Sequence, residues 1–254
     1  MQLDKFIIEG GKPLSGELVP SGNKNAALPL LAACLLTEEP VILHNVPEIR
    51  DVQTMLQLIR SLGTDVTRLG SNAYRIQASD IASSRLDPEL LKQIRASILL
   101  AGPMTARTGV LDLSPPGGDV IGRRRVDTHI LALQAMGASA AYERDLKVFK
   151  FRAPGGLKGA DILLDEASVT GTENAIMAAV LAKGHTVIRN AASEPHIQEL
   201  CHMLNQMGAR IENIGSNTLH IEGAASLHGT EYTVGPDYLE VVSYIGAAVV
   251  THGE

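Results

Sequence analysis

The fold is decided by a stretch that occurs twice, as Ser21-Gly22-Asn23-Lys24-Asn25-Ala26 and again as Thr170-Gly171-Thr172-Glu173-Asn174-Ala175. Each copy joins a Ser/Thr-Gly turn to an apolar run typical of a buried helix. Later marks recur at a constant spacing: the pairs 145 residues apart are Asn45 and Asn190, Gly63 and Gly208, and Asn72 and Asn217. Self-similarity at a fixed spacing indicates a fold built from repeated units.

A middle copy lies about halfway between these two, with Arg95-Ala96-Ser97 opening its first helix and Met136-Gly137-Ala138 closing its second. We therefore expect an α/β (α+β) fold of three complete units of about seventy residues, each close to βαβαββ. A fourth unit begins near Leu227, and the sequence ends at Glu254 before that unit is complete. An apolar helix without the strands it should cover suggests a fragment or a truncated protein.

Local residues support these units. Gly63, Gly137 and Gly208 each follow Leu or Met at the end of an amphipathic run, where a glycine at C′ closes a helix. Asp51 is placed to cap the first of these helices. Gly70-Ser71-Asn72 is a predicted hairpin turn.

Positions at which the copies differ are free for function. Lys24 in the first copy corresponds to Glu173 in the third, so the fold itself does not require a lysine there. A lysine at the start of a helix opposes the helix dipole, which favours a bound anion held by the lysine and the backbone N–H groups together. Asn25 and Asn174 agree between the copies, so a turn role for this asparagine remains an alternative.

The segment Pro115–Asp127 has no counterpart in the other units. It contains two prolines, three glycines, Asp119 and three consecutive arginines at 123–125, and it joins a strand-like run to a helix-like run. Arginines bind phosphate and carboxylate groups through several donors at once. The segment is therefore either a cationic cradle for an anion, with an acid beside it, or an ordinary solvated turn.

Composition narrows the class of protein. A net charge of −6 argues against general nucleic-acid binding, and aromatic residues make up only 3% of the chain. Cys34 and Cys201 lie in apolar runs and are expected to be buried thiols, and no spacing of Cys and His indicates a metal site. The N-terminus lacks the features of a signal peptide and no stretch has the length of a membrane span, so we expect a cytoplasmic protein with no membrane partner.

Several motifs together resemble one known family. The residues that carry the resemblance are Ser21-Gly22, Lys24-Asn25-Ala26-Ala27-Leu28-Pro29, Asn45-Val46-Pro47 with Asp51, Arg95-Ala96-Ser97, Gly102-Pro103, and Pro116-Gly117-Gly118 through Arg124, Val126-Asp127 and His129. Along its whole length the chain resembles the UDP-N-acetylglucosamine 1-carboxyvinyltransferases, which are enolpyruvyl transferases. The resemblance implies an inside-out α/β barrel with three units in each of two domains. It also implies transfer of the enolpyruvyl group of phosphoenolpyruvate to the 3′-hydroxyl of UDP-N-acetylglucosamine, the first committed step of peptidoglycan synthesis, without a cofactor.

The resemblance also implies roles for particular residues. Lys24 and Asn25 would hold phosphoenolpyruvate, Arg124 would contact its phosphate, and Arg95 would contact the sugar nucleotide. Two runs would surround the uridine: Arg125, Val126, Asp127 and Thr128, together with Glu166, Ala167, Ser168 and Val169. Asp119 takes the place of the cysteine found in most members and would act as the proton donor, which requires its pKa to rise towards neutrality.

The implied domain organisation has three parts. Residues 1–21 would form the first strand or strands of an incomplete domain, residues 22–230 the complete domain with the loop, and residues 231–254 the start of the returning, truncated domain. A second departure from the family pattern occurs at Pro236-Asp237-Tyr238-Leu239-Glu240. The chain also stops before the aspartate and distal arginines that the family uses, so little activity is expected of it alone.

Two other functions stay open at this point. A shikimate-pathway enolpyruvyl transferase shares the fold and the donor substrate but lacks the run that contacts uridine. A non-catalytic paralogue could bind the sugar nucleotide as a sensor or partner subunit. Titration with the sugar nucleotide would separate a binding module from an inert remnant.

Asp119 generates a first prediction. The epoxide fosfomycin inactivates this family by alkylating the loop thiolate, so an enzyme with Asp119 should resist it, and Asp119→Cys should confer sensitivity. Inhibition assays and mass spectrometry of the loop peptide measure both effects. Covalent labelling of the loop in the protein that retains Asp119 would contradict the prediction.

Overall fold

The computed structural model describes residues 5–118 and 125–254, which form two compact units. The larger unit comprises Gly22–Gly235, and the smaller comprises the N-terminal segment to Ser21 together with Pro236–Glu254. Each is described by itself below.

The helices of the larger unit are α1 (Lys24–Ala33), η1 (Cys34–Leu36), α2 (Arg50–Ser61), α3 (Pro88–Leu91), η2 (Arg95–Leu100), α4 (Ala101–Thr108), α5 (Asp127–Ala135), α6 (Val169–Ala179) and α7 (Pro195–Gln206), where η marks a 3₁₀ helix. Its strands are β1 (Val41–His44), β2 (Asp65–Gly70), β3 (Ala73–Gln77), β4 (Val110–Leu113), β5 (Ser139–Glu143), β6 (Val148–Arg152), β7 (Asp161–Leu163), β8 (His185–Arg189), β9 (Arg210–Glu212), β10 (Thr218–Glu222) and β11 (Glu231–Thr233).

The strands form three sheets of related topology, with the orders β11-β1-β3-β2, β7-β8-β10-β9 and β4-β6-β5. In the first two, an edge strand runs parallel to its neighbour and the other pairs are antiparallel. The third sheet is antiparallel, with a single parallel bridge from Arg85 to Asp112 beside β4. The repeat read from the sequence therefore reappears as a repeated sheet pattern.

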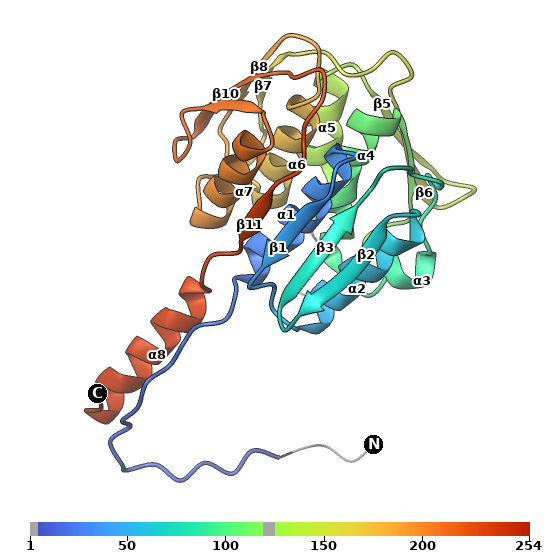
Figure 1. Ribbon diagram of the computed structural model, residues 1–254. Coiled ribbons are helices and arrows are strands. Elements are labelled where there is room, and N and C mark those ends of the chain that lie inside the picture. The colour runs from blue at the N-terminus through green and yellow to red at the C-terminus, as the bar shows by residue number, and fades with distance from the viewer. Residues whose placement is uncertain (1–4, 119–124) are drawn as a thin grey trace. The chain divides into compact units, whose positions relative to one another are not determined.

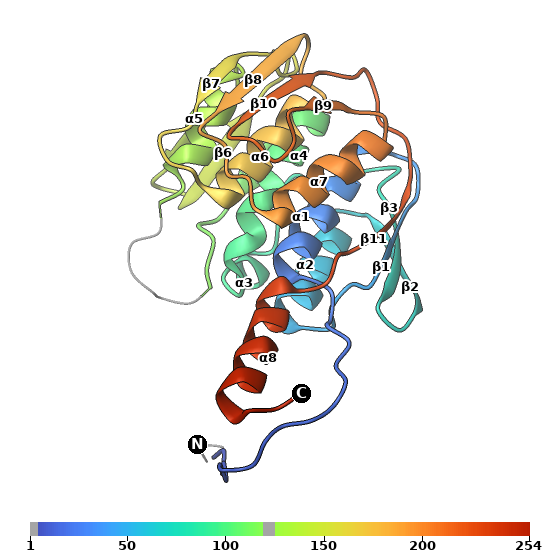
Figure 2. The same cartoon turned by 90° about the vertical axis from the view of Figure 1, so that its left-hand side faces the viewer.

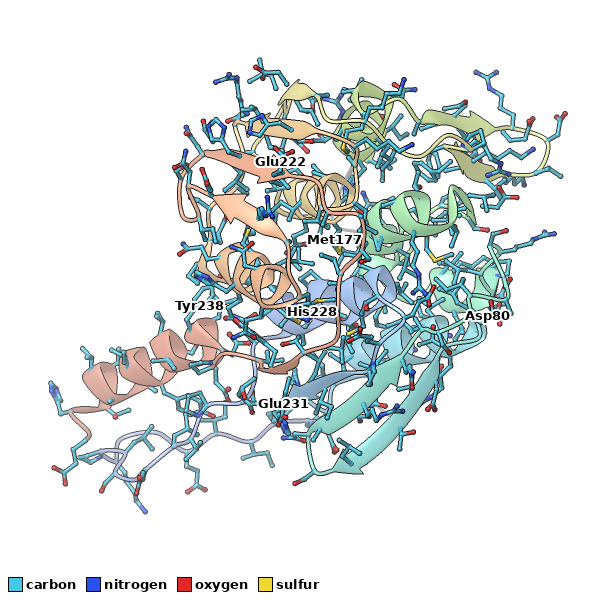
Figure 3. All side chains as sticks on the ribbon, turned by 45° about the horizontal axis from the view of Figure 1, so that its top comes forward. Asp80, Met177, Glu222, His228, Glu231 and Tyr238 are labelled. Atoms are coloured by element: carbon cyan, nitrogen blue, oxygen red, sulfur yellow. The ribbon has the colours of Figure 1, made fainter. Side chains whose placement is uncertain are left out.

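Helices fill the space between the sheets. Figures 1 and 2 show α1, α4 and α6 inside the unit, with the three sheets towards its outside. Every residue of α1 from Ala26 to Ala33 is buried, as is every residue of α6 from Gly171 to Ala179. Met177 on α6, labelled in Figure 3, has no exposed surface. A helix that is apolar all round must be covered on all sides, which explains why the sheets lie outside the helices.

The predicted α/β class is confirmed, whereas the number of units in a complete barrel stays a prediction. Gly63, Gly137 and Gly208 have φ values of 98°, 91° and 97° directly after α2, α5 and α7, so their predicted role in closing these helices is confirmed. Cys34 and Cys201 are buried free thiols, as expected.

Two details differ from the prediction. Residues 5–21 contain no strand, because a strand needs a neighbouring strand and this segment has only a helix beside it. The edge strand of the first sheet comes instead from β11, which pairs in parallel with β1. Residues 231–235 consequently group with residues 22–230, and the wider division into domains of a complete enzyme stays a prediction.

The smaller unit consists of the N-terminal segment and α8 (Tyr238–Thr251). Asp237 caps α8 by accepting hydrogen bonds from the amides of Leu239 and Glu240. Glu240 accepts hydrogen bonds from the amide and hydroxyl of Ser21 at 2.9 and 2.8 Å. No residue of α8 is buried, although the helix is rich in valine and alanine.

Residues 5–118 and 125–254 lack two features. None of the helices there is both long enough and apolar enough for a membrane span. No group of three or more His, Cys, Asp or Glu side chains is placed to hold a metal ion.

A buried hydrogen-bond network joins the inner helices. His129 on α5 is 2% exposed, and its Nδ1 accepts a hydrogen bond from the side-chain amide of Asn174 at 2.7 Å, while its Nε2 lies 3.2 Å from the Thr170 hydroxyl. Asn174 also donates to the carbonyl of Ile98 and accepts from the amide of Gly102. Asn174 is therefore a core residue of α6 and not a turn residue. The turn role considered for it is wrong.

The network predicts a pH dependence of stability. Burial, and secondly the charge of Arg95, lower the pKa of His129 from 6.5 to about 4 in the folded protein. A lowered pKa means that stabilisation by neutral His129 is present above pH 6.5 and is lost as the pH falls towards 4. The difference corresponds to about 3 kcal/mol in the free energy of unfolding.

His129→Gln should remove this part of the pH dependence between pH 7 and 4, because glutamine can donate and accept similar hydrogen bonds without titrating. Urea unfolding measured across this pH range tests the expectation, with the exposed His202→Gln as the matched control. An unchanged pH dependence in His129→Gln would contradict it.

Candidate anion-binding site

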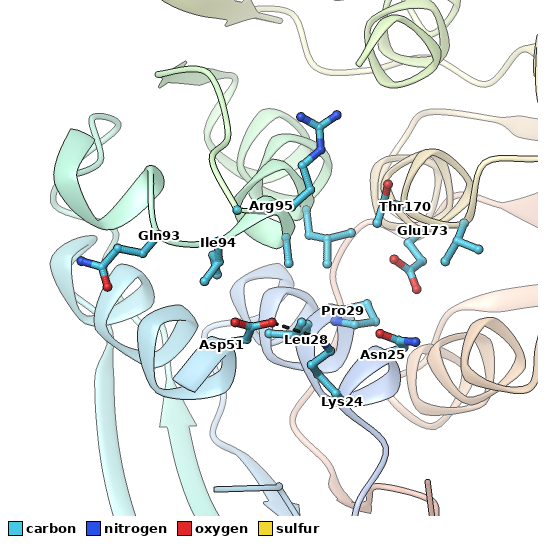
Figure 4. Close-up of a pocket in the computed structure, with 14 residues that line it drawn as sticks. Lys24, Asn25, Leu28, Pro29, Asp51, Gln93, Ile94, Arg95, Thr170 and Glu173 are labelled. Carbon is cyan, nitrogen blue, oxygen red and sulfur yellow. Dashed lines mark hydrogen bonds and ion pairs between the residues drawn. The ribbon is translucent and has the colours of Figure 1, made fainter. Parts of the chain in front are cut away.

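Residues at the beginnings of four helices, α1, α2, η2 and α6, line one pocket of about 220 Å³ in the larger unit. Figure 4 shows residues of α1, α2, η2 and α6 around it. The residues that line it are Lys24, Asn25, Leu28 and Pro29 from α1, Asp51 from α2, Gln93, Ile94, Arg95, Ala96 and Leu99 from η2 and the turn before it, Gly118, and Val169, Thr170 and Glu173 from α6. The helix dipoles place partial positive charge at this point.

Lys24 is the first residue of α1, and Asn25 follows it. The side chain of Asn23 caps this helix and accepts hydrogen bonds from the amides of Asn25 and Ala26 at 2.7 and 3.2 Å. The sequence suggested that backbone amides and Lys24 would hold an anion together, but these two amides already have a partner. The Lys24 ammonium group is consequently the principal cation that α1 offers to a ligand.

Lys24 forms an ion pair with Asp51, with Nζ and Oδ2 3.2 Å apart. The predicted capping role of Asp51 is wrong, because α2 begins at Arg50 after Ile49 and has no side-chain cap. The two side chains are 44% and 39% exposed. A pair this exposed contributes about 0–1 kcal/mol, so an anionic ligand can compete with Asp51 for the lysine.

A second polar cluster surrounds the start of α5. Arg125 contacts Asp127 at 2.7 Å and Asp165 at 3.4 Å, and the hydroxyl of Thr128 donates to Asp165 at 2.6 Å. The carbonyl of Val126 accepts from the amide of Ile130 in the first turn of α5. Asp165 is the acceptor that joins Arg125 to Thr128.

Arg95 joins this cluster to the pocket. Its guanidinium donates a hydrogen bond to the backbone carbonyl of Arg125 at 2.9 Å. On the other side of the segment 119–124, the amides of Gly117 and Gly118 donate to the carbonyls of Leu91 and Lys92 at 3.1 and 3.2 Å. A Cβ atom at Gly117 would lie 1.8 Å from the Lys92 carbonyl oxygen, so this close approach requires glycine.

The remaining predicted residues lie at or near the start of α6. Ser168 caps this helix by accepting from the amide of Gly171 at 3.2 Å, and its own amide donates to the carbonyl of Glu166. Val169 lines the pocket, whereas Glu166 and Ala167 are exposed. Asp119 and Arg124 lie outside the described residues, so the proton-donor and phosphate-contact roles expected of them stay predictions.

The structure thus brings some predicted residues together and adds others. Lys24, Asn25, Arg95 and Val169 meet at the pocket, and Arg125, Asp127 and Thr128 form the neighbouring cluster with Asp165. Sequence reasoning missed Glu173 as a pocket residue. The signal that could have found it was an acid two residues before the apolar run 175–182, in the stretch expected to form a buried helix.

A second cavity, of about 390 Å³, is lined by η1 and Arg107 among others. The Arg107 guanidinium donates to the carbonyls of Leu35 and Thr37, each at 2.8 Å, and to that of Ala78. The donors of Arg107 are therefore occupied by backbone carbonyls. Of the two cavities, the pocket beside Lys24 is consequently the better anion site.

Comparisons with known proteins identify the family of the chain. Residues 8–254 match the family model described as EPSP synthase (3-phosphoshikimate 1-carboxyvinyltransferase). UDP-N-acetylglucosamine 1-carboxyvinyltransferases from Treponema denticola and Treponema pallidum are 54% and 56% identical over 99% and 98% of the chain. The one from Bradyrhizobium diazoefficiens is 56% identical over 97% of the chain.

Solved structures show the same fold. The enolpyruvyl transferase NikO from Streptomyces tendae superposes with a TM-score of 0.81 at 24% identity, covering 94% of this chain and 56% of that one. EPSP synthase from Acinetobacter baumannii gives a TM-score of 0.74 at 20% identity, covering 94% of this chain and 54% of that one. The chain spans 56–58% of the length of the three relatives named above. Because the family model matches nearly the whole chain, the chain belongs to the EPSP synthase (3-phosphoshikimate 1-carboxyvinyltransferase) family.

Proposed function

We propose that this chain serves in the transfer of the enolpyruvyl group from phosphoenolpyruvate to the 3′-hydroxyl of UDP-N-acetylglucosamine, with release of phosphate. The observation that carries the proposal is the pocket at which Lys24, Asn25 and Arg95 meet at the starts of buried helices. Relatives with 54–56% identity bear the name of this activity. A cytoplasmic location and a place in peptidoglycan synthesis are parts of the same proposal.

Phosphoenolpyruvate carries a phosphate and a carboxylate, so its site must supply cations. Lys24 adds its charge to the dipole of α1, and Asn25 beside it can donate through its side-chain amide. The net charge of the chain is −6, so this concentration of positive charge is local. The phosphate would displace Asp51 from Lys24, exchanging an exposed ion pair for a charge-assisted hydrogen bond.

The sugar nucleotide is assigned to the cluster beside the pocket. Arg125 is already oriented by Asp127 and Asp165, so its remaining guanidinium donors are presented at little further cost in side-chain entropy. The Thr128 hydroxyl donates its proton to Asp165 and could accept a hydrogen bond from the nucleotide. Glu166, Ala167, Ser168 and Val169 would complete the uridine site at the start of α6. Arg95, fixed to the Arg125 carbonyl, would lie between the nucleotide and the phosphoenolpyruvate.

The chemical step needs groups on both reactants. Asp119 would deliver a proton to the methylene carbon of phosphoenolpyruvate while the sugar hydroxyl adds to its C2 carbon. The hydroxyl proton would pass to the aspartate that the family carries beyond this chain. The adduct would then lose a proton from its new methyl group and phosphate from C2, which forms the enol ether of the product. Arg124 and Lys24 would stabilise the departing phosphate. These roles follow from the family resemblance.

The identity of the acceptor separates two members of the family. A shikimate-pathway enzyme would take 3-phosphoshikimate, a smaller acceptor without uridine. The cluster of Arg125, Asp127, Thr128 and Asp165 favours the nucleotide, because it provides a polar surface beyond the pocket itself. A sugar-nucleotide-binding protein without catalysis remains the second candidate, and turnover assays of an enzyme containing this chain distinguish it.

Calorimetric titration tests the acceptor. The chain should bind UDP-N-acetylglucosamine and not 3-phosphoshikimate, and Arg125→Ala should weaken nucleotide binding by about ten-fold, since a hydrogen bond to a charged group contributes about 1.5–3 kcal/mol. The exposed Arg210→Ala is the matched control for loss of one positive charge. Preference for 3-phosphoshikimate, or equal nucleotide affinity in both variants, would refute the assignment.

Lys24→Ala tests the donor site. Affinity for phosphoenolpyruvate should fall by about ten-fold or more, and added salt should weaken binding to the parent protein. Lys183→Ala, which removes an exposed lysine outside the pocket, should bind normally. Titrations at low and moderate ionic strength give the measurement. An affinity that is independent of Lys24 would place the anion elsewhere.

A further inference from the structure

Glu173 is a buried acid on the wall of the pocket. Its side chain is 1% exposed, yet it belongs to the residues that line the cavity. Among the described residues, its Oε1 atom has no hydrogen-bond partner. Figure 4 shows its carboxyl group pointing from α6 towards the start of α1, where Asn25 lies. A polar atom with this burial and no partner calls for an explanation.

The surroundings of Glu173 determine its charge. Burial, and secondly the carboxylate of Glu194, raise the pKa of Glu173 well above its ordinary value. Glu194 precedes α7 and also has a buried oxygen, Oε2, without a partner among the described residues. Two carboxyl groups placed this way favour a proton on the more deeply buried one.

The other titratable groups on the surrounding elements leave this conclusion unchanged. Burial and the nearness of Glu173 raise the pKa of the Cys201 thiol on α7 to about 12, so it is uncharged. His129 on α5 is neutral, as described above, and burial lowers the pKa of His196 on α7. Among the described residues that line the same pocket, the cations are Lys24, which pairs with Asp51, and Arg95, which bonds the Arg125 carbonyl.

An uncharged carboxyl group differs from a carboxylate because it can donate a hydrogen bond. Ionised Glu173 would repel an anion that enters beside Lys24, whereas protonated Glu173 would attract it. Within the protein, the buried Oε1 has no partner among the described residues. Glu173 lines the pocket, where a ligand could accept a hydrogen bond from its carboxyl group.

We propose that Glu173 is a ligand-binding residue of this pocket and that, as an uncharged carboxylic acid, it donates a hydrogen bond to an oxygen of the anion held by Lys24 and Asn25. The ligand class is a phosphate monoester or carboxylate, and no proton is transferred. The inference rests on the proposed function, since it concerns the same pocket. The proposal also accounts for a difference between the repeats. Lys24 and Glu173 occupy corresponding positions in the first and third repeats, and they supply a cation and a neutral acid to one ligand.

The first test concerns the free 254-residue chain. Infrared spectra with ¹³C-labelled glutamate should contain the C=O band of a protonated carboxyl group at neutral pH, and Glu173→Gln should lose it. Glu222→Gln, at an exposed carboxylate on β10 (Figure 3), should retain it. Absence of the band in the parent protein, or its survival in Glu173→Gln, would overturn the proposal.

The second test measures binding of phosphoenolpyruvate by calorimetry across pH. Glu173→Gln keeps a donor and should bind within about two-fold of the parent, whereas Glu173→Leu should bind about ten-fold more weakly. Parent affinity should fall as Glu173 ionises at high pH, and this fall should be absent in Glu173→Gln. Circular dichroism and thermal unfolding establish that each variant is folded, and Glu173→Gln provides the decisive pH comparison if Glu173→Leu does not fold.

The outcomes separate this inference from the proposed function. If Lys24→Ala loses binding, either of two results would refute the role of Glu173 and leave the proposed function intact. One is normal affinity in Glu173→Leu, and the other is the same pH dependence in the parent and in Glu173→Gln. No binding by the parent chain, with the protonated band present, would refute the anion site itself. Weak binding by Glu173→Leu, normal binding by Glu173→Gln and weak binding by Lys24→Ala would support both.

Discussion

The convergence of buried helix beginnings on one pocket is the constraint on which the rest of the structure depends. Apolar helices such as α1 and α6 must be covered all round, so the sheets lie outside them. The repeated topology then brings the starts of α1, η2 and α6 to the same pocket. Because helix starts carry partial positive charge, the fold creates a site for anions before any functional side chain is added. The side chains of Lys24, Arg95 and Glu173 then determine which anion that site can bind.

Much of this arrangement could be predicted from the sequence, because it depends on local signals. Glycines such as Gly63 and Gly208 closed helices where expected, since their backbone conformation is set by neighbouring residues. The family resemblance named Lys24, Asn25 and Arg95, which do meet at one pocket. From the sequence, residues 231–254 were assigned to the returning domain, whereas β11 is the edge strand of the first sheet. Its position depends on pairing with β1, which lies almost two hundred residues earlier in the chain.

The side-chain partners were harder to predict than the elements. Asp51 sits in the first turn of α2, where the sequence favours a cap, yet its carboxylate pairs with Lys24 from another helix. Asp165 bonds Thr128 and Arg125 across a distance in sequence of about forty residues, which no local pattern encodes. Glu173 was read only as the counterpart of Lys24 in the repeat. These choices are made by tertiary packing: Asp51 and Asp165 each pair with a group from a different element of the fold, and Glu173 faces the pocket.

The central claim is that anionic substrates bind where the inner helices begin. Backbone amide chemical shifts of the chain, recorded by nuclear magnetic resonance during titration with phosphoenolpyruvate and UDP-N-acetylglucosamine, test it most directly. The account predicts that the largest changes occur at residues 24–26, 94–96 and 169–171, with a second group at 125–128 for the nucleotide. Changes confined to the cavity beside Arg107, or no saturable change at any of these residues, would contradict the account.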